Sequence, residues 1–403
     1  MKTDVVIVGA GPAGSTAAKY LADAGVDVLL VDAHQFPRKK ACGGGIPMRV
    51  LKRYPYLENS DFIEAYSYGG VTYSASMNYT MTIEKEDPLI AMVQRDTFDN
   101  ALLNFAIDAG ATFLDECKII DMKISADKAT IMTNKGDSID AQLVVGADGF
   151  TSIIRRKMKQ RQPMKNCALC IVAEYPLREK VVDQWFTKNR HCHIFLKTMN
   201  LQGYAWVFPK RSSVNIGLGE YRFSDGKPVQ KNNLRQMFDS FVSLLKQQKI
   251  VPQDLREAPV SGGGFSTSPV KTTYDDRVLL CGDAAGFVNP VSGEGIYYAI
   301  VSGELAAKVL VDSLDHEDTS ARFLSSYQTN WYADFGRDLN LLVRSSKRWK
   351  NNTESLLKVA RHNKELAELC IDVMTGEKSA YEMRGTLIRK YCAAKIKTAL
   401  RLH

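Results

Sequence analysis

A chain of 403 residues is long enough for two or three domains with their own cores. Its composition, 45% hydrophobic and 24% charged, excludes a disordered or fibrous protein. No uncharged apolar run reaches the ~18 residues that a membrane-spanning helix needs. The net charge of +8 lies entirely in residues 337–403, where 15 Lys and Arg accompany 7 Asp and Glu. This basic end favours an anionic lipid or a phosphorylated substrate as partner, and no motif beside it predicts nucleic-acid binding.

The cysteine pattern and the N-terminus predict a cytoplasmic protein. Eight cysteines follow no small-scaffold pattern, which favours free thiols in a reducing cytosol. Asp4 stands where a secretory signal would be apolar, although a peripheral contact with the inner face of a membrane stays open. Cys167, Cys170 and the run 191–193 have zinc-ligand types, but an odd separation puts the two cysteines on opposite faces of a strand. We therefore expect no metal site.

The chain begins with a predicted strand (4–9), a helix (12–24) and a second strand (27–32). The turn Gly9-Ala10-Gly11-Pro12-Ala13-Gly14 lets backbone N–H groups approach a pyrophosphate, at which the next helix points its positive end. Asp32 follows Gly9 by 23 residues, close to the spacing of about 20 at which an acid binds a nucleotide ribose. The alternatives are a sharp turn without a ligand and an NAD site.

Two further glycine-and-acid signals follow predicted strands. They are Val145-Gly146-Ala147-Asp148-Gly149 and Cys281-Gly282-Asp283-Ala284-Ala285-Gly286. Together with the first signal they indicate one FAD rather than NAD. The other predicted elements are a glycine-rich loop at 41–45, strands at 66–73, 77–84, 111–115, 117–124, 128–133, 142–147, 168–175, 191–198, 203–209, 213–220 and 278–281, helices at 95–110, 231–248 and 295–311, and helices from about 320 onward.

This order of elements predicts an α/β fold. It consists of a Rossmann-like FAD-binding domain, discontinuous in sequence, an inserted antiparallel-sheet substrate domain and a C-terminal helical region. The layout resembles the flavoprotein fold of the para-hydroxybenzoate hydroxylase type, and within it the geranylgeranyl reductase family. The resemblance implies an FAD-binding domain at 1–66, 90–160 and 268–318, a substrate-binding domain at 67–89 and 161–267, and the helical region at 319–403.

Three stretches carry the resemblance to the reductases. Cys42-Gly43-Gly44-Gly45-Ile46-Pro47 is similar to their Cys-Gly-Gly-Ala-Ile-Pro loop, with glycine in place of alanine. Tyr204-Ala205-Trp206-Val207-Phe208-Pro209 matches their Tyr-x-Trp-x-Phe-Pro pattern, and the region from Gly282 to Tyr297 matches almost as closely. The resemblance implies hydride transfer from reduced flavin to isolated C=C bonds of geranylgeranyl chains on a lipid, a diphosphate or a related isoprenoid.

The same resemblance assigns site residues. Asp148-Gly149 supports the flavin, Asp283 meets the ribityl chain and diphosphate, and Arg95 returns toward the flavin unless it is a surface arginine at a helix start. The implied cofactor-binding residues are Gly9, Gly11, Pro12, Ala13, Gly14, Asp32, Ala33, Cys42, Gly43, Gly44, Arg95, Asp148, Gly149, Gly282, Asp283, Gly293, Gly295 and Ile296. The implied catalytic residues are Cys42, Gly293 and Gly295, and Tyr204, Trp206, Phe208 and Pro209 are implied to bind substrate.

Physical reasoning supports several of these roles. On a strand, Tyr204, Trp206 and Phe208 share one face, which makes either a dry wall for an apolar chain or simply core. Gly293 and Gly295 permit a close approach to the isoalloxazine, and a helix from Ile296 directs partial positive charge at it. Cys42 is interpreted as a proton donor or a gate for flavin reduction, with an inert packed thiol as the alternative.

Other features leave alternatives open. Arg38-Lys39-Lys40 and Arg155-Arg156-Lys157 are either phosphate contacts or solvated surface. The 387–401 segment predicts a basic amphipathic helix that lies on a membrane or packs on the protein's own core. The rival functions are a flavin monooxygenase or halogenase and a membrane-peripheral electron carrier, although halogenases have Trp-x-Trp-x-Ile-Pro at the aromatic strand. The electron donor is either a nicotinamide, a ferredoxin or another carrier.

Overall fold

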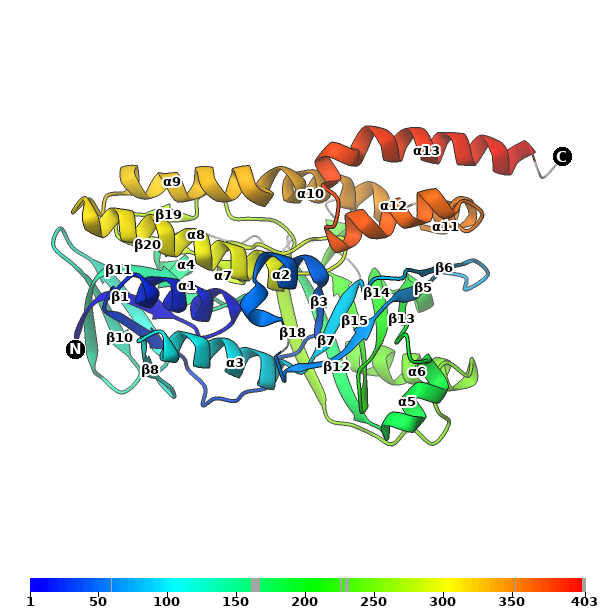
Figure 1. Ribbon diagram of the computed structural model, residues 1–403, viewed down its shortest axis with the longest axis horizontal. Coiled ribbons are helices and arrows are strands. Elements are labelled where there is room, and N and C mark those ends of the chain that lie inside the picture. Colours follow the sequence, from blue (N-terminus) through cyan, green and yellow to red (C-terminus); the bar gives the residue numbers. More distant parts are fainter. Residues whose placement is uncertain (59, 161–166, 225–226, 229–231, 352, 401–403) are drawn as a thin grey trace. The chain divides into compact units, whose positions relative to one another are not determined.

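The computed structural model describes residues 1–403 except 59, 161–166, 225–226, 229–231, 352 and 401–403 (Figure 1). The chain forms two compact units, each assembled from three separate stretches. The first unit comprises Met1–Lys39, Arg95–Asn166 and Phe265–Val343, and the second comprises Lys40–Gln94, Cys167–Gly264 and Arg344–His403.

The first unit is built on a mostly parallel sheet with the strand order β19-β20-β11-β1-β2-β8. The bounds are Tyr274–Asp275 (β19), Val278–Leu280 (β20), Ser138–Gly146 (β11), Lys2–Val8 (β1), Val28–Val31 (β2) and Thr112–Leu114 (β8). β20, β11, β1, β2 and β8 pair in parallel, and β9 (Ile119–Ile124) and β10 (Ala129–Thr133) continue antiparallel from β11. β1 lies between β11 and β2, and its Val5, Val6 and Ile7 are fully buried, as expected for a parallel strand covered on both faces.

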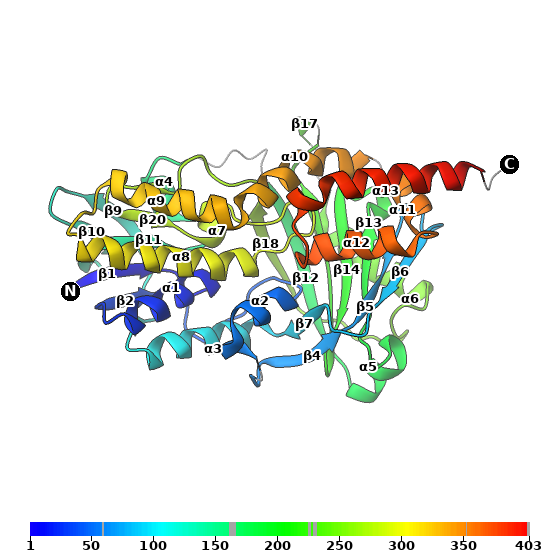
Figure 2. The ribbon, with the colours of Figure 1, turned by 45° about the horizontal axis from the view of Figure 1, so that its top comes forward.

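Helices complete this unit. α1 (Pro12–Asp23) packs against both α3 (Arg95–Asp108) and α8 (Ile296–Asp315), as Figures 1 and 2 show. The approach of α8 to α1 is close because Gly303 has no side chain: a Cβ there would lie 2.3 Å from the Ala13 carbonyl oxygen. The remaining helices of the unit are α4 (Ile153–Lys157), α7 (Gly282–Ala285), α9 (Ala321–Trp331), a π-helical turn (Tyr332–Gly336) and the start of α10 (Arg337–Asn351).

The second unit contains a seven-stranded sheet with the order β18-β12-β15-β14-β13-β5-β6. The bounds are Val260–Ser266 (β18), Cys167–Pro176 (β12), Ser213–Tyr221 (β15), Gly203–Pro209 (β14), Cys192–Leu196 (β13), Gly69–Tyr73 (β5) and Thr80–Glu84 (β6). β12, β15, β14 and β13 pair antiparallel, whereas β13 and β5 run parallel. A smaller sheet pairs β3 (Gly45–Pro47), β7 (Ile90–Val93) and β4 (Ile63–Ser67), and β16 (Phe223–Ser224) pairs with β17 (Lys227–Pro228).

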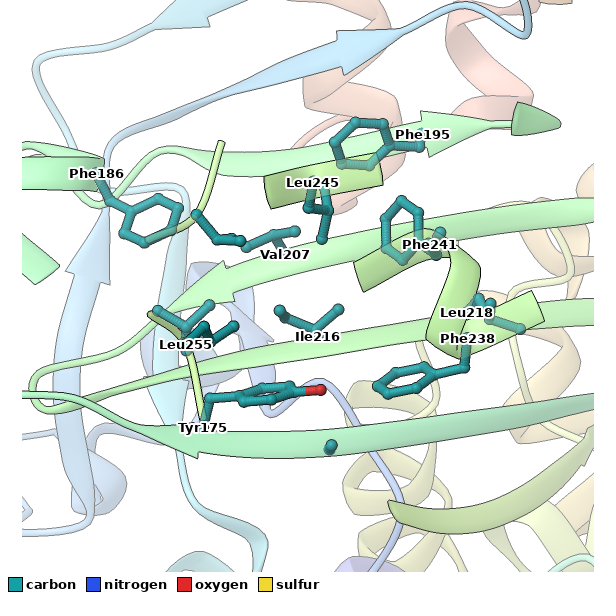
Figure 3. Close-up of a cluster of buried hydrophobic side chains, with 14 of the residues drawn as sticks. Tyr175, Phe186, Phe195, Val207, Ile216, Leu218, Phe238, Phe241, Leu245 and Leu255 are labelled. Carbon is teal, nitrogen blue, oxygen red and sulfur yellow. The ribbon is translucent and has the colours of Figure 1, made fainter. Parts of the chain in front are cut away.

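Two helices help form the core on one face of the large sheet. α5 (Glu179–Phe186) and α6 (Leu234–Gln247) contribute Phe186, Phe238 and Phe241, which pack with inward residues of the strands (Figure 3). From β14 this cluster takes Ala205 and Val207, the residues that alternate with the three aromatic residues of that strand. The aromatic side chains therefore belong to the other face of the sheet.

The C-terminal helices form a separate cluster within the second unit. These helices are α11 (Thr353–Ala360), α12 (Lys364–Thr375) and α13 (Ala380–Leu400), labelled in Figure 2. Leu357, Leu366 and Ala394 of these helices pack with Met81 and Ile83 of β6. Among the described residues, no helix is long and apolar enough to cross a membrane.

The predicted α/β fold class is confirmed, and most predicted elements have counterparts. The predicted strand 66–73 is in fact β4 and β5, which lie in different sheets. α2 (Met48–Arg53), α5, β7 and β18 were not predicted, because each is short and its pattern depends on packing partners distant in sequence. The compact units also group residues 40–66 and 344–403 with the substrate-binding stretches and 319–343 with the nucleotide fold, so the three-part domain division stays a prediction.

Candidate functional site

The parallel sheet explains how three distant signals meet in the first unit. Val8 is in register with Val31 on one side and Gly146 on the other, and Gly146 is in register with Leu280. Each of the three glycine-and-acid signals therefore leaves the carboxyl end of a neighbouring strand. In open parallel sheets this edge is where ligands bind.

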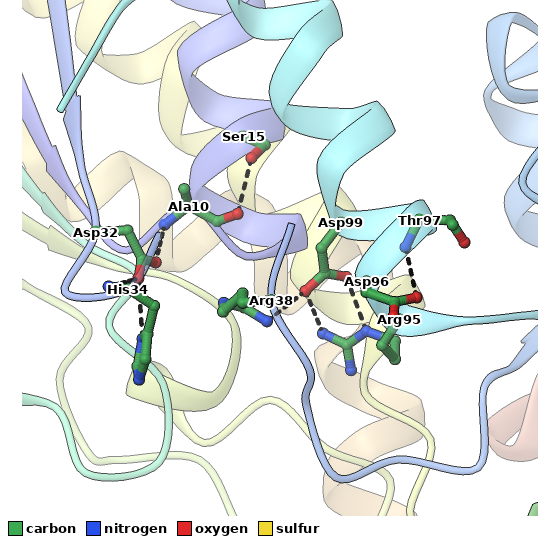
Figure 4. Close-up of polar contacts among 9 residues, drawn as sticks. All are labelled: Ala10, Ser15, Asp32, His34, Arg38, Arg95, Asp96, Thr97 and Asp99. Carbon is green, nitrogen blue, oxygen red and sulfur yellow. Dashed lines mark hydrogen bonds and ion pairs between the residues drawn. The ribbon is translucent and has the colours of Figure 1, made fainter. Parts of the chain in front are cut away.

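The first signal forms a tight turn in which two glycines are required by contacts. Gly9 has φ +102°, and a Cβ on it would lie 2.4 Å from the Ala147 carbonyl oxygen. A Cβ on Gly14 would lie 1.8 Å from the Gly9 oxygen. Asp32 holds the turn through Oδ2, which accepts the Ala10 N–H at 2.8 Å, while Ser15 Oγ donates to the Ala10 oxygen (Figure 4). Asp32, the acid expected to bind the ribose, therefore also stabilises the loop.

A buried carboxylate gathers two arginines beside this turn. Asp99 is fully buried and accepts Nε and Nη2 of Arg95 at 2.8 and 2.9 Å, and Arg38 Nη1 lies 2.9 Å from its Oδ2 (Figure 4). The Arg38 guanidinium reaches to 3.5 Å from the place a Cβ would take on Gly11. Arg95 is therefore not a surface arginine, and Arg38 places positive charge over the pyrophosphate-type turn. Sequence reasoning missed Asp99, because nothing in its helix pattern marks it.

The second signal contains an unsatisfied polar atom. Asp148 Oδ2 accepts the Ile153 N–H at 2.6 Å and the Ile154 N–H at 3.3 Å, whereas its buried Oδ1 has no hydrogen-bond partner among the described residues. Burial raises the pKa of Asp148, and hydrogen bonds from Ser152 and the backbone oppose that rise. An orphaned buried oxygen indicates a place for a bound polar group.

Arg155 links the second and third signals. This buried guanidinium donates from Nη2 to Phe150 O at 2.7 Å and from Nη1 to Ala284 O at 3.3 Å. Burial lowers the pKa of Arg155, while the charges of Asp148 and Asp283 raise it. The solvated-surface interpretation is therefore wrong for Arg38 and Arg155. Lys39, Lys40, Arg156 and Lys157 are exposed, so both interpretations stay open for them.

The turn before α8 lies against the third signal. Gly293 has φ +70°, and a Cβ on Gly295 would lie 3.5 Å from Asp283 Oδ1. Glu294 has a structural role that its sequence did not reveal: its Oε1 accepts the Tyr297 N–H at 2.7 Å in the first turn of α8. The carboxylate thereby satisfies one of the free amides at this helix start.

The second unit brings the Cys42 loop onto the aromatic strand. A Cβ on Gly43 would lie 2.8 Å from the Phe208 ring and 3.1 Å from Trp206 Nε1. Gly44 has φ +74°, and a Cβ there would meet the Val93 oxygen at 2.2 Å. The Gly44 N–H donates to Cys42 Sγ at 3.4 Å. The loop is glycine-rich because it lies directly on the rings.

The aromatic residues form a continuous row on β14. Ring centroids are 5.7 Å apart for Tyr204 and Trp206 and 6.3 Å apart for Trp206 and Phe208. A Cβ on Gly217 would lie 2.1 Å from the Trp206 ring, so this glycine of β15 makes room for the indole. Burial raises the pKa of Tyr204 well above its usual range. The sequence analysis did not predict a role for Gly217. The signal that could have found it is its position opposite Trp206 on a neighbouring strand.

Comparison with known proteins places this geometry in a family. A family model described as FAD binding domain matches residues 2–331. Digeranylgeranylglycerophospholipid reductase 1 of Methanopyrus kandleri is 32% identical over 348 residues, which are 83% of this chain and 87% of that protein. The chain belongs to the digeranylgeranylglycerophospholipid reductase family of FAD-binding proteins. A second reductase of the same organism is 30% identical over 86% of both chains.

Solved structures of this fold include more than one kind of flavoprotein. A geranylgeranyl bacteriochlorophyll reductase-like protein of Thermoplasma acidophilum has a TM-score of 0.80 at 22% identity, covering 95% of this chain and 99% of that one. The flavin-dependent halogenase CmlS has a TM-score of 0.67 at 21% identity, covering 90% of this chain and 65% of that one. At these identities the likeness concerns the fold alone.

The reductase-family chain has a first unit that fits FAD. Its glycine turn, the Arg38 charge and the orphaned Asp148 oxygen supply what a dinucleotide needs: close backbone approach, compensation of phosphate charge and a hydrogen-bonding site. The predicted cofactor, FAD, is confirmed by the family match. Which atoms each predicted residue contacts remains a proposal. In the described part of the chain no group of three or more His, Cys, Asp or Glu is arranged to hold a metal ion.

Proposed function

We propose that this chain is an FAD-dependent reductase that saturates isolated C=C bonds of geranylgeranyl chains carried by a lipid, a diphosphate or a related isoprenoid. The observation that carries the proposal is the packing of the Cys42 loop on Trp206 and Phe208, which joins an acid–base group to an apolar wall. The relatives named as digeranylgeranylglycerophospholipid reductases support this substrate class.

Different residues of the chain supply different parts of the proposed reaction. When bound, FAD supplies the hydride in its reduced form. In the proposed reaction the hydride adds to one carbon of the double bond, and Cys42 Sγ donates a proton to the other carbon. The Gly44 N–H, whose nitrogen lies 3.4 Å from Sγ, stabilises the thiolate that remains. Tyr204, Trp206 and Phe208 exclude water, since an isolated alkene is a poor hydride acceptor and needs a dry, aligned site. Each bond reduced therefore gains two hydrogens, with the electrons coming from a donor still to be identified.

The test is reduction without oxygen. The purified protein is chemically reduced under anaerobic conditions, and geranylgeranyl diphosphate or a geranylgeranylated phospholipid is added. The masses of the products are then measured by mass spectrometry. We expect a mass gain of two hydrogens per bond reduced. Products that require oxygen would favour a monooxygenase or halogenase, and flavin oxidation without any lipid product would favour an electron carrier.

We also propose that α13 touches an anionic membrane surface. The predicted apolar face is divided in the structure: Leu387 and Tyr391 pack against the C-terminal cluster, whereas Ile388 and Ile396 are 64% and 61% exposed. Their spacing of eight residues, with the exposed Cys392 between them, makes a stripe on the outer side of the helix. The exposed basic residues Arg384, Arg389, Lys395 and Lys397 accompany this stripe. Leu400, predicted on the apolar face, and Arg401, predicted on the basic face, lie outside the described side chains.

Exchanging both isoleucines for aspartate should release the protein from anionic vesicles. We expect Ile388→Asp/Ile396→Asp to weaken binding to phosphatidylglycerol vesicles by about tenfold or more in flotation assays, because two apolar anchors are lost and negative charge is added. Ile120→Asp is the matched control, since Ile120 is a 50% exposed isoleucine of β9. Equal binding of both variants would contradict the proposal. Point changes are preferable to truncating α13, because Ala394 belongs to the C-terminal core.

A further inference from the structure

One buried amide connects the Cys42 loop to the aromatic strand. Asn215, on β15, is 3% exposed. Its Nδ2 donates to the Cys42 carbonyl oxygen at 3.1 Å and to Glu174 Oε2 at 2.7 Å. Its Oδ1 accepts the Trp206 indole N–H at 2.8 Å. The side-chain amide thus donates two hydrogen bonds and accepts one, and its three partners lie on three different segments of the chain.

The surrounding charges fix which way this amide points. Glu174 Oε2 also accepts Lys210 Nζ at 2.9 Å, and its Oε1 accepts Ser213 Oγ at 2.6 Å. Lys210 is 1% exposed and donates further to Gln94 Oε1 at 3.1 Å. A flipped amide would set its oxygen against the Glu174 carboxylate and the Cys42 carbonyl. The network therefore imposes one orientation, with the donor toward Cys42 and the acceptor toward Trp206.

We propose that Asn215 is a positioning residue that holds Cys42 and Trp206 in fixed relative positions. The proposal rests on the proposed function, in which Cys42 gives a proton to an alkene lying on the aromatic wall. Asparagine suits the position because aspartate lacks the donor and leucine lacks both donor and acceptor. Without the amide the loop loses its hydrogen bond to β15, and the thiol and the wall can shift independently. Small misplacements of this kind lower the rate of the chemical step more than substrate binding.

The first test does not depend on activity. In the FAD-loaded protein, alkylation of Cys42 by iodoacetamide is followed by peptide mass spectrometry, with the exposed Cys392 as internal reference. We expect Asn215→Ala to raise the Cys42 rate about fivefold relative to Cys392, because one buried hydrogen bond no longer holds the loop. Asn215→Ser serves as the second variant should alanine fail to fold. Glu220→Gln is the matched control, since Glu220 is fully buried on the same strand and bonds Asn232 instead.

The second test separates rate from binding. In folded Asn215 variants we expect kcat for prenyl reduction to fall about tenfold with KM and FAD content little changed. Cys42 alkylation and kcat both within about twofold of the wild type would overturn the proposal. Equal changes in Glu220→Gln would also overturn it, because they would mark a general loosening of β15. A wild-type protein that reduces no prenyl chain would instead contradict the proposed function, and the alkylation result would still decide whether Asn215 holds the loop.

Discussion

Replacing Cys42 by alanine is expected to leave FAD bound and to slow alkene reduction by about a hundredfold or more, the range in which positioned general acids act. In the proposed function the Cys42 thiol is the proton donor, and its glycine loop packs on Trp206 and Phe208. Alanine leaves the loop backbone free to keep its hydrogen bond to Asn215. Single-turnover reduction by the chemically reduced protein, with FAD content measured from its absorbance, gives both quantities.

Cys392→Ala is the control for this experiment, since Cys392 is an exposed thiol of α13. An unchanged single-turnover rate in Cys42→Ala would remove Cys42 from the mechanism. Loss of FAD from the same variant would assign the loop a structural role instead. Cys42→Ser, which retains a weaker acid, should lie between alanine and the wild type.

Replacing Gly14 by alanine is expected to abolish stable FAD binding. The new Cβ would lie 1.8 Å from the Gly9 carbonyl oxygen, so the start of α1 must move away from the turn that approaches the pyrophosphate. We expect the FAD dissociation constant to rise about a hundredfold or more, because a displaced backbone cannot be compensated by a side-chain rotation. Flavin fluorescence titration of the apoprotein measures this constant, and thermal unfolding reports the stability of the fold.

Two other glycines supply controls of different meaning. At Gly25 a Cβ meets nothing within 4 Å although φ is +79°, so Gly25→Ala tests strain without a clash. At Gly11 the nearest atom is an Arg38 nitrogen at 3.5 Å, an ordinary contact, so Gly11→Ala should fold normally. If Gly11→Ala nevertheless loses FAD, the ligand itself needs the space. Normal FAD binding by Gly14→Ala would contradict the close-packed turn.

The nucleotide half of the candidate site was largely marked in the sequence. Gly9, Gly14, Asp32 and Asp148 are marked by their spacing and by the apolar strands before them, because a phosphate-binding turn depends on local backbone geometry. The carboxyl ends of parallel strands then bring the separate signals to one edge of the sheet. The Cys42 loop and the aromatic strand were singled out through the family resemblance. The alternation of aromatic residues along the strand did not by itself distinguish a wall that binds substrate from part of the core.

What the sequence determined by itself was the cofactor and the order of elements, since both follow from local patterns of glycine, acid and apolar residues. Only the tertiary structure decided which polar side chains are buried and what they contact. Asp99, Arg155 and Asn215 have no local signature, and their partners lie on other elements or are recognisable only once burial is known. Burial itself results from packing between segments distant in the chain, and it turns an ordinary charged or amide side chain into one that fixes a loop. The same packing divided the apolar residues of α13 between core and surface, which no helical periodicity distinguishes.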